Sequence, residues 1–249
     1  MKKIMPCLDT FDGKLVKGVK FEINKEFGDP VEYAKKYCED GADELAVLDI
    51  NATPEGRATL LEVVKNISAV CTVPLTVGGG IRSVEEIEKV LDAGADKVSI
   101  NTAAVNRPEL IKEAAEKFGS EKIVVAIDFT KKDGTWKVLV NAGKTIVDKD
   151  VIEWAKEAEE LGAGTLLPTS LDADGTKKGF DLEATRLIKE SVSVPVIASG
   201  GAGTLEDMYK VLTEGKADVA LAASIFHYGE YTVRDVKKYL KEKGVEVNL

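Results

Sequence analysis

An internal repeat with a period of about half the chain constrains the fold of this 249-residue sequence more than any other feature. Four segments of the first half have counterparts 119 to 122 residues further along the chain. The pairs are Asp9 with Asp128, Leu48–Thr53 with Thr169–Asp174, Val77–Ser83 with Ala198–Thr204, and Asp96–Thr102 with Asp218–Ser224. The unit is far longer than a solenoid repeat, so the sequence predicts a duplicated half-domain.

Short apolar runs typical of buried strands alternate with helical segments throughout the chain. We expect strands at about 4–9, 44–50, 74–78, 97–101, 122–128, 164–169, 195–199 and 218–222, with a small hairpin inserted at 129–140. Eight strand–helix units in about 250 residues predict an α/β fold, a (β/α)8 TIM barrel. We expect one domain, residues 1–249, made of half-barrels at about 1–120 and 121–249. A doubly wound open sheet is the alternative, but the two-fold repeat favours the closed barrel.

Composition excludes several classes of function. The net charge of −9 argues against binding to nucleic acid or to an anionic membrane surface, and no apolar run is long enough for a membrane span. The N-terminal apolar run is too short for a signal peptide, so we expect a cytoplasmic protein. Three scattered cysteines predict reduced, mostly buried thiols. With His227 as the only histidine and no zinc-like cysteine spacing, we expect no metal site.

The carboxyl ends of the strands are where a barrel carries its active site. Asp9 and Asp128 end equivalent strands, and two separated acids can act as general acid and general base. Glycine-rich turns at 78–80 and 200–203 also occupy equivalent places, and such turns let backbone N–H groups approach an anion. One acid can be a simple cap, and one glycine turn can serve conformation alone. Their repetition predicts a catalytic pair between two phosphate sites.

Several further segments resemble the cyclase subunit of imidazole glycerol phosphate synthase, an enzyme of histidine biosynthesis. These segments are Pro6–Asp9, Val16–Gly18, Gly28–Pro30, Asp43–Leu45, Thr76–Arg82, Ala95–Ala104, Val124–Asp128, Asp174–Lys177, Ile197–Gly203 and Ala220–His227. The resemblance covers essentially the whole chain. The histidine-pathway isomerase shares the barrel, the paired acids and the paired phosphate sites, but Cys7-Leu8-Asp9 and Ser99–Ala104 favour the cyclase.

The resemblance implies a (β/α)8 barrel enzyme that needs no cofactor. Such an enzyme adds ammonia from a partner glutaminase, docked at the amino-terminal face, to a bisphosphorylated formimino-ribulosyl substrate. Its products are imidazole glycerol phosphate and an aminoimidazole carboxamide ribotide. The implied roles are catalysis by Asp9 and Asp128; substrate or phosphate binding by Lys17, Gly80, Asn101, Thr102, Asp174, Gly175, Gly201, Ala223 and Ser224; and an ammonia gate of Lys3, Glu44 and Lys97.

The chain departs from the family pattern at several positions. The residues in question are Lys25, Phe129, Ala142, Thr165, Pro168 and Ala173. Thr165 replaces a gate glutamate, and we expect Phe129 to place a ring beside the Asp128 carboxyl group. Two alternatives to a native cyclase therefore stay open. One is an engineered barrel on this scaffold with a new ligand or a proton-abstraction activity, and the other is a non-catalytic scaffold.

Overall fold

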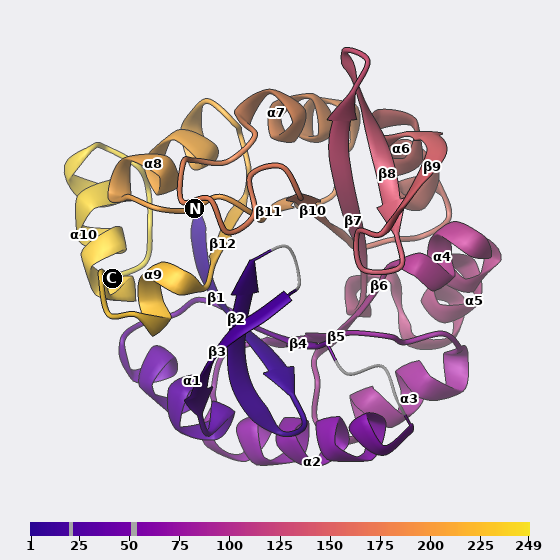
Figure 1. Cartoon of the computed structure of the whole chain (residues 1–249), viewed down its shortest axis with the longest axis horizontal. Helices are drawn as coiled ribbons and strands as arrows, with labels where there is room; N and C mark the ends of the chain where they lie inside the picture. The colour runs from indigo at the N-terminus through magenta and orange to yellow at the C-terminus, as the bar shows by residue number, and fades with distance from the viewer. Residues whose placement is uncertain (20–21, 51–53) are drawn as a thin grey trace.

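The chain folds into a closed barrel of eight parallel strands surrounded by helices (Figure 1). The computed structural model describes residues 1–19, 22–50 and 54–249. The barrel strands are β1 (Lys3–Phe11), β4 (Leu45–Asp49), β5 (Leu75–Gly78), β6 (Lys97–Ile100), β7 (Ile123–Lys132), β10 (Thr165–Ser170), β11 (Ile197–Ala198) and β12 (Val219–Ala222). They pair in this order, and β12 pairs with β1. Bridges from Leu166 to Val196 and from Thr169 to Ser199 join β10 to β11 and complete the ring.

The helices form the outer layer of the barrel (Figure 1). They are α1 (Pro30–Glu39), α2 (Pro54–Val70), α3 (Val84–Asp92), α4 (Thr102–Asn106), α5 (Glu109–Phe118), α6 (Val151–Glu160), α7 (Leu182–Ser191), α8 (Leu205–Thr213), α9 (Ser224–His227) and α10 (Val233–Glu242). Asp29 caps α1 as the Asp-Pro signal predicts, with its carboxylate accepting from the Val31 N–H. Among the described residues, the structure contains no helix with both the length and the apolar character of a membrane span.

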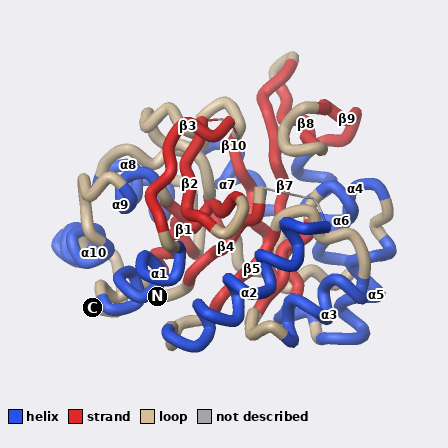
Figure 2. The backbone as a smooth tube through the Cα atoms, turned by 60° about the horizontal axis from the view of Figure 1, so that its bottom comes forward, coloured by secondary structure: helices blue, strands red, loops and turns tan. Residues whose placement is uncertain are grey.

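Both half-barrels extend their first strand into an antiparallel hairpin. β1 continues into β2 (Lys14–Val19) and β3 (Glu22–Gly28), and β7 continues into β8 (Thr135–Val140) and β9 (Thr145–Asp150). Figure 2 shows both extensions rising from the same side of the barrel, away from the two chain termini. Only the second hairpin is predicted from the sequence. The Asp-Gly pairs at the two tips explain both turns, since Asp12 and Asp133 adopt φ values of 49° and 50° before glycines that also have positive φ.

Equivalent interactions recur in the two halves of the chain. Asp96 accepts a hydrogen bond from the Leu75 N–H, and Asp218 accepts one from the Val196 N–H. The caps of α3 and α8 are equivalent as well, because Ser83 and Thr204 each accept from the N–H three residues later. The repeat match at 48–53 includes residues 51–53, which lie outside the described residues. These equivalences support the proposal that residues 1–249 form one domain of two half-barrels.

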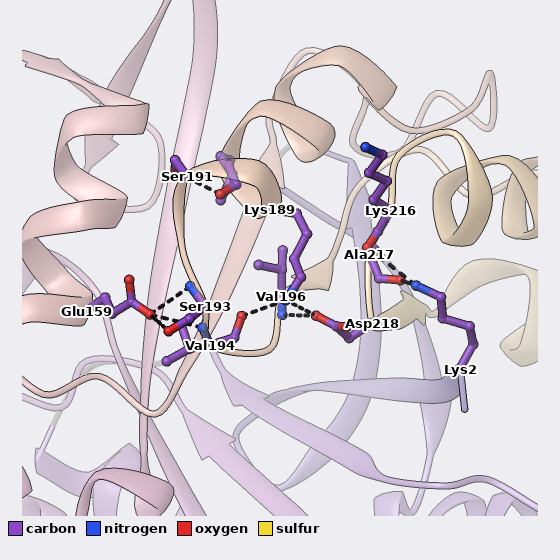
Figure 3. A network of polar contacts seen from close by, with 11 residues as sticks. Lys2, Glu159, Lys189, Ser191, Ser193, Val194, Val196, Lys216, Ala217 and Asp218 are labelled. Atoms are coloured by element: carbon purple, nitrogen blue, oxygen red, sulfur yellow. Dashed lines mark hydrogen bonds and ion pairs between the residues drawn. The ribbon is translucent and has the colours of Figure 1, made fainter.

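Polar contacts lock the amino-terminal end of the barrel between α6 and β12 (Figure 3). Glu159 accepts from the backbone N–H groups of Ser193 and Val194, which lead into β11. Lys189 pairs with Asp218 at 2.9 Å and also donates to the Val194 carbonyl. The network places β11 even though only Ile197–Ala198 form a regular strand, which is shorter than the predicted 195–199.

Two apolar layers result from the alternation of side chains along the barrel strands. The larger layer lies between the strands and the helices and includes Ile4, Leu8 and Trp154. A separate cluster fills the barrel interior with Met5, Cys7, Ala46, Val124, Leu167, Ile197, Val219 and Leu221. This inner cluster separates the amino-terminal end of the barrel from its carboxyl-terminal end.

Candidate active site

A cavity of about 1060 Å³ opens at the carboxyl-terminal end of the barrel strands. Pockets that bind small molecules typically measure about 300–1,000 Å³, so this cavity is large enough for a ligand with a group at each end. Every residue predicted to be catalytic or to bind substrate lines it: Asp9, Lys17, Gly80, Asn101, Thr102, Asp128, Asp174, Gly175, Gly201, Ala223 and Ser224. The structure thus brings together residues from positions 9 to 224 in one space.

The two acids face the cavity from opposite sides of the ring. Asp9 belongs to β1 and Asp128 to β7, and three strands separate β1 from β7 in either direction around the barrel. Asp128 is buried, and Asp9 is partly exposed with 17% of its side chain accessible. The two carboxyl groups therefore sit in different environments, as an acid and base pair requires.

Asp9 forms an ion pair with Lys17 on the neighbouring strand β2. The Lys17 Nζ lies 3.0 Å from Asp9 Oδ2, and the Cys7 thiol lies 3.5 Å from Asp9 Oδ1. Burial lowers the pKa of Lys17, but the charges of Asp9 and Asp174 outweigh burial and raise that pKa above its ordinary value. Lys17 is therefore a fixed positive charge beside Asp9. Burial and the Asp9 charge raise the pKa of Cys7, so this thiol stays protonated.

Asp128 is the acid that titrates near neutral pH. Its pKa is raised to about 7 in total: burial raises it most, a hydrogen bond with Asn101 lowers it, and the charge of Asp174 raises it. A general acid or base works best when its pKa lies near the working pH. Asp128 therefore has the protonation behaviour of a proton-transfer group, and its burial is the main cause.

The turn after β5 and the start of α4 form one side of the cavity. Gly79 packs so closely against the end of β4 that a Cβ atom there would lie 2.0 Å from the Asp49 carbonyl oxygen. Its φ of 111° also favours glycine. The Gly79 turn leads to Gly80, which lines the cavity, and Asn101 and Thr102 line it from the end of β6.

The turn after β11 and the start of α9 form the opposite side of the cavity. Three strands separate β11 from β5, and β12 from β6, in either direction around the ring. Gly200 is the equivalent of Gly79, and a Cβ atom there would lie 2.7 Å from the Ser170 carbonyl oxygen. Gly201 and Ser224 complete this wall together with Asp174, which follows β10. Thr53, the counterpart of Asp174 in the repeat, lies outside the described residues.

The turn between β8 and β9 contributes cavity residues that the sequence did not single out for binding. Asn141, Ala142, Gly143 and Lys144 line the cavity, and the Asn141 N–H donates to Thr102 Oγ1 over 2.9 Å. Asn141 and Ala142 both have φ values of 55°, an uncommon conformation for residues with side chains. The Asn-Ala-Gly run was the available signal for a turn, but only the closed barrel brings that turn to Thr102.

The departures from the family pattern mostly lie outside the cavity. Phe129 packs in the layer between strands and helices, so the expectation of a ring beside the Asp128 carboxyl group was wrong. Successive side chains of a strand point to opposite faces, which explains the error. Lys25 lies 4.8 Å from the Phe27 ring centroid and 4.6 Å from that of Tyr228. Of the six departures, only Ala142 lines the cavity.

The predicted gate residues form an ion cluster at the opposite, amino-terminal end of the barrel. Glu44 is almost fully buried and pairs with the Lys3 Nζ at 2.7 Å and with the Lys97 Nζ at 3.3 Å. Thr165, at the start of β10, is buried as well. In the part of the chain that the structure describes, His, Cys, Asp and Glu side chains form no group of three or more that could hold a metal ion.

Comparison with known proteins identifies the family. The model of the family described as "Histidine biosynthesis protein" matches residues 3–232. The chain belongs to this histidine-biosynthesis family. It is 56% identical over 248 residues to imidazole glycerol phosphate synthase subunit HisF of Geobacillus thermodenitrificans (strain NG80-2), covering 99% of this chain and 98% of that protein. The HisF subunit of Geobacillus kaustophilus (strain HTA426) is similar to the same extent. Membership in the histidine-biosynthesis family agrees with the resemblance found in the sequence and with the observed barrel.

Proposed function

We propose that this chain is the cyclase subunit of an imidazole glycerol phosphate synthase. Its relatives named HisF are 56% identical over nearly their whole length. The chain converts ammonia and a bisphosphorylated formimino-ribulosyl substrate into imidazole glycerol phosphate and an aminoimidazole carboxamide ribotide. The observation that carries the assignment is a single cavity with two opposed acids and two opposed glycine-rich walls.

The two walls are the proposed phosphate sites. Backbone N–H groups of Gly80 and the Thr102 hydroxyl form one set of donors, while Gly201 and the Ser224 hydroxyl form the other. Lys17 adds a mostly buried positive charge to the cavity wall beside Asp9. A substrate with a phosphate at each end would span the cavity, with its reacting centre held between Asp9 and Asp128.

The environments of the two acids suggest separate roles. Asp9, in its ion pair with Lys17, acts as the base, and Asp128 holds a proton close to neutral pH and acts as the acid. Asn101 positions Asp128 by a hydrogen bond that favours the ionised form once the proton has left. The pair can thus remove a proton on one side of the ring that closes and deliver one on the other.

The amino-terminal end is the proposed entry for ammonia and the proposed docking face for a glutaminase subunit. The relatives are named as subunits of a synthase, which supports a partner for this chain. The Lys3–Glu44–Lys97 cluster closes this end of the barrel, and the inner apolar cluster lies between it and the cavity. Free ammonia at high concentration would reach the cavity from solvent and make the partner unnecessary.

Turnover of the bisphosphorylated substrate with an ammonium salt tests the proposal. We expect cyclisation by the purified chain, a loss of about 100-fold or more in Asp9→Asn and Asp128→Asn, and retained substrate binding in both variants. Asp133→Asn, at the exposed tip of the β7–β8 hairpin, is the matched control and should keep full activity. Binding without turnover by the unmodified chain would contradict the cyclase assignment and favour a non-catalytic scaffold.

A further inference from the structure

Two half-buried cysteines meet at the amino-terminal end of the barrel, far along the chain from each other. Cys38 lies in the last turn of α1, and Cys71 follows α2 directly. Their Sγ atoms are 2.8 Å apart, although 33 residues separate them in the sequence. Helices α1 and α2 pack side by side, as Figures 1 and 2 show. The expectation of mostly buried thiols holds for Cys7 only, because the other two are partly accessible.

The surroundings of the two sulfur atoms differ. The Cys71 thiol and the backbone N–H groups of Thr72 and Val73 stabilise a Cys38 thiolate, and together they lower the pKa of Cys38 to about 7 despite partial burial. The same contact with Cys38, together with burial, raises the pKa of Cys71. A shallow cavity of about 260 Å³ opens beside Cys71 and extends towards Gly94. This cavity is lined by Cys71 and not by Cys38. Cys38 is itself partly exposed, so a small reagent can approach a Cys38 thiolate that has a second thiol in contact with it.

We propose that Cys38 and Cys71 form a reversible thiol-modification site, in which Cys38 is the nucleophile and Cys71 the resolving thiol that closes a disulfide. The site is independent of the catalytic cavity, which opens at the other end of the barrel strands. A disulfide needs an S–S distance of about 2.05 Å, so the sulfur atoms must approach by less than about 1 Å. Their existing contact makes the second thiol available as soon as the first reacts.

The reacting partner is a low-molecular-weight disulfide. The Cys38 thiolate attacks one sulfur of that disulfide, forms a mixed disulfide and releases one small thiolate. Cys71 then loses its proton to the released thiolate or to solvent and attacks the Cys38 sulfur. This second step forms the Cys38–Cys71 bond and releases the second small molecule as a thiolate, which takes a proton from solvent. Both cysteines are oxidised together by two electrons, and the small disulfide is reduced to two thiols.

Closure of the bond would tie the end of α1 to the end of α2. The cross-link encloses a loop of 33 residues, and a loop of this length restricts the unfolded chain substantially. We expect the melting temperature of the oxidised chain to rise by roughly 5–10 °C. Added dithiothreitol should reverse the rise.

Oxidised glutathione, added to the fully reduced chain, tests the site. We expect intact mass to show the loss of two hydrogens, and peptide mapping to find Cys38 linked to Cys71. In Cys71→Ser, the resolving thiol is gone, so a stable glutathione adduct should accumulate on Cys38. Cys7→Ser serves as the matched control and should still form the link, because Cys7 lies within the barrel interior.

Three results would overturn the proposal. The first is a wild-type chain that stays fully reduced under conditions in which a model dithiol is oxidised. The second is glutathionylation without any Cys38–Cys71 link. The third concerns Cys38→Ser: if its glutathione adduct forms on Cys71 as fast as the adduct on Cys38 forms in Cys71→Ser, Cys38 is not the preferred nucleophile. The mass readout on the wild-type chain stands even where a variant fails to fold.

Discussion

Replacement of Asp128 by asparagine should make the chain more stable at neutral pH while removing its activity. The carboxyl group of Asp128 is buried, and burial raises its pKa from 3.8 to about 7. Between these two values the unfolded chain has released the proton and the folded chain still holds it. Unfolding therefore releases a proton in this range, and the stability of the wild-type chain falls as the pH rises from about 4 to about 7.

The magnitude follows from the same two values. Their difference is about 3 pH units, and each unit corresponds to about 1.4 kcal/mol, so the ionised Asp128 destabilises the fold by about 4 kcal/mol above pH 7. Of this, about 2 kcal/mol develops between pH 5 and pH 7, because Asp128 is only half ionised at pH 7, and about 3 kcal/mol between pH 5 and pH 8. Asparagine has nearly the same shape and no charge, so Asp128→Asn lacks this pH-dependent contribution.

Urea denaturation at pH 5 and at pH 8 measures the effect. We expect the difference in unfolding free energy, Asp128→Asn minus wild type, to increase by about 3 kcal/mol from the lower to the higher pH. Comparison across pH cancels the constant effects of the new side chain. Thr169→Val alters the residue paired with Asp128 on β10 without changing charge, and its difference should be the same at both pH values.

A pH-independent difference for Asp128→Asn would refute the reasoning. Such a result would mean that the carboxyl group is hydrated in solution, or that a cation stabilises its ionised form in addition to the hydrogen bond with Asn101. The assignment of Asp128 as the group that holds a proton near neutrality would fail with it. The pH profile of ammonium-dependent turnover would then show no ionisation near 7.

Three further changes test the walls and the gate. Gly79→Ala should lower the free energy of unfolding by roughly 3 kcal/mol or more in urea denaturation, because its Cβ would meet the Asp49 carbonyl oxygen at 2.0 Å. Gly134→Ala is the control: its Cβ would enter open space, and the free energy of unfolding should fall by only about 1 kcal/mol. Glu44→Gln should destabilise by about 1–2 kcal/mol, since the buried carboxylate loses two ion pairs while Lys3 and Lys97 keep contact with solvent; an unchanged denaturation midpoint would contradict this. Ser224→Ala should weaken calorimetric binding of the bisphosphorylated substrate by roughly tenfold, and no loss would exclude its hydroxyl as a phosphate donor.

The residues at the ends of the strands could be predicted from the sequence because they repeat. Asp9 and Asp128 recur at nearly the same spacing as the glycine turns, and in a barrel all carboxyl ends of strands meet at one face. Residues of the β8–β9 turn could not be assigned in this way. Asn141 reaches Thr102 only because β7 is next to β6 in the ring and extends beyond the barrel. No local sequence pattern predicts how far a strand extends.

The sequence by itself determined the order of strands and helices, the two-fold repeat and the identity of the paired acids, since these depend on local periodicity and spacing. Strand alternation alone puts Phe129 and Asp128 on opposite faces of β7. Only the tertiary structure decided that the face with Asp128 lines the cavity and the face with Phe129 packs against the helices. Burial likewise sets the pKa of Asp128, and burial arises from the closed ring rather than from adjacent residues. The contact between Cys38 and Cys71 depends on how α1 packs against α2, because side chains distant in sequence meet only when the helices are docked.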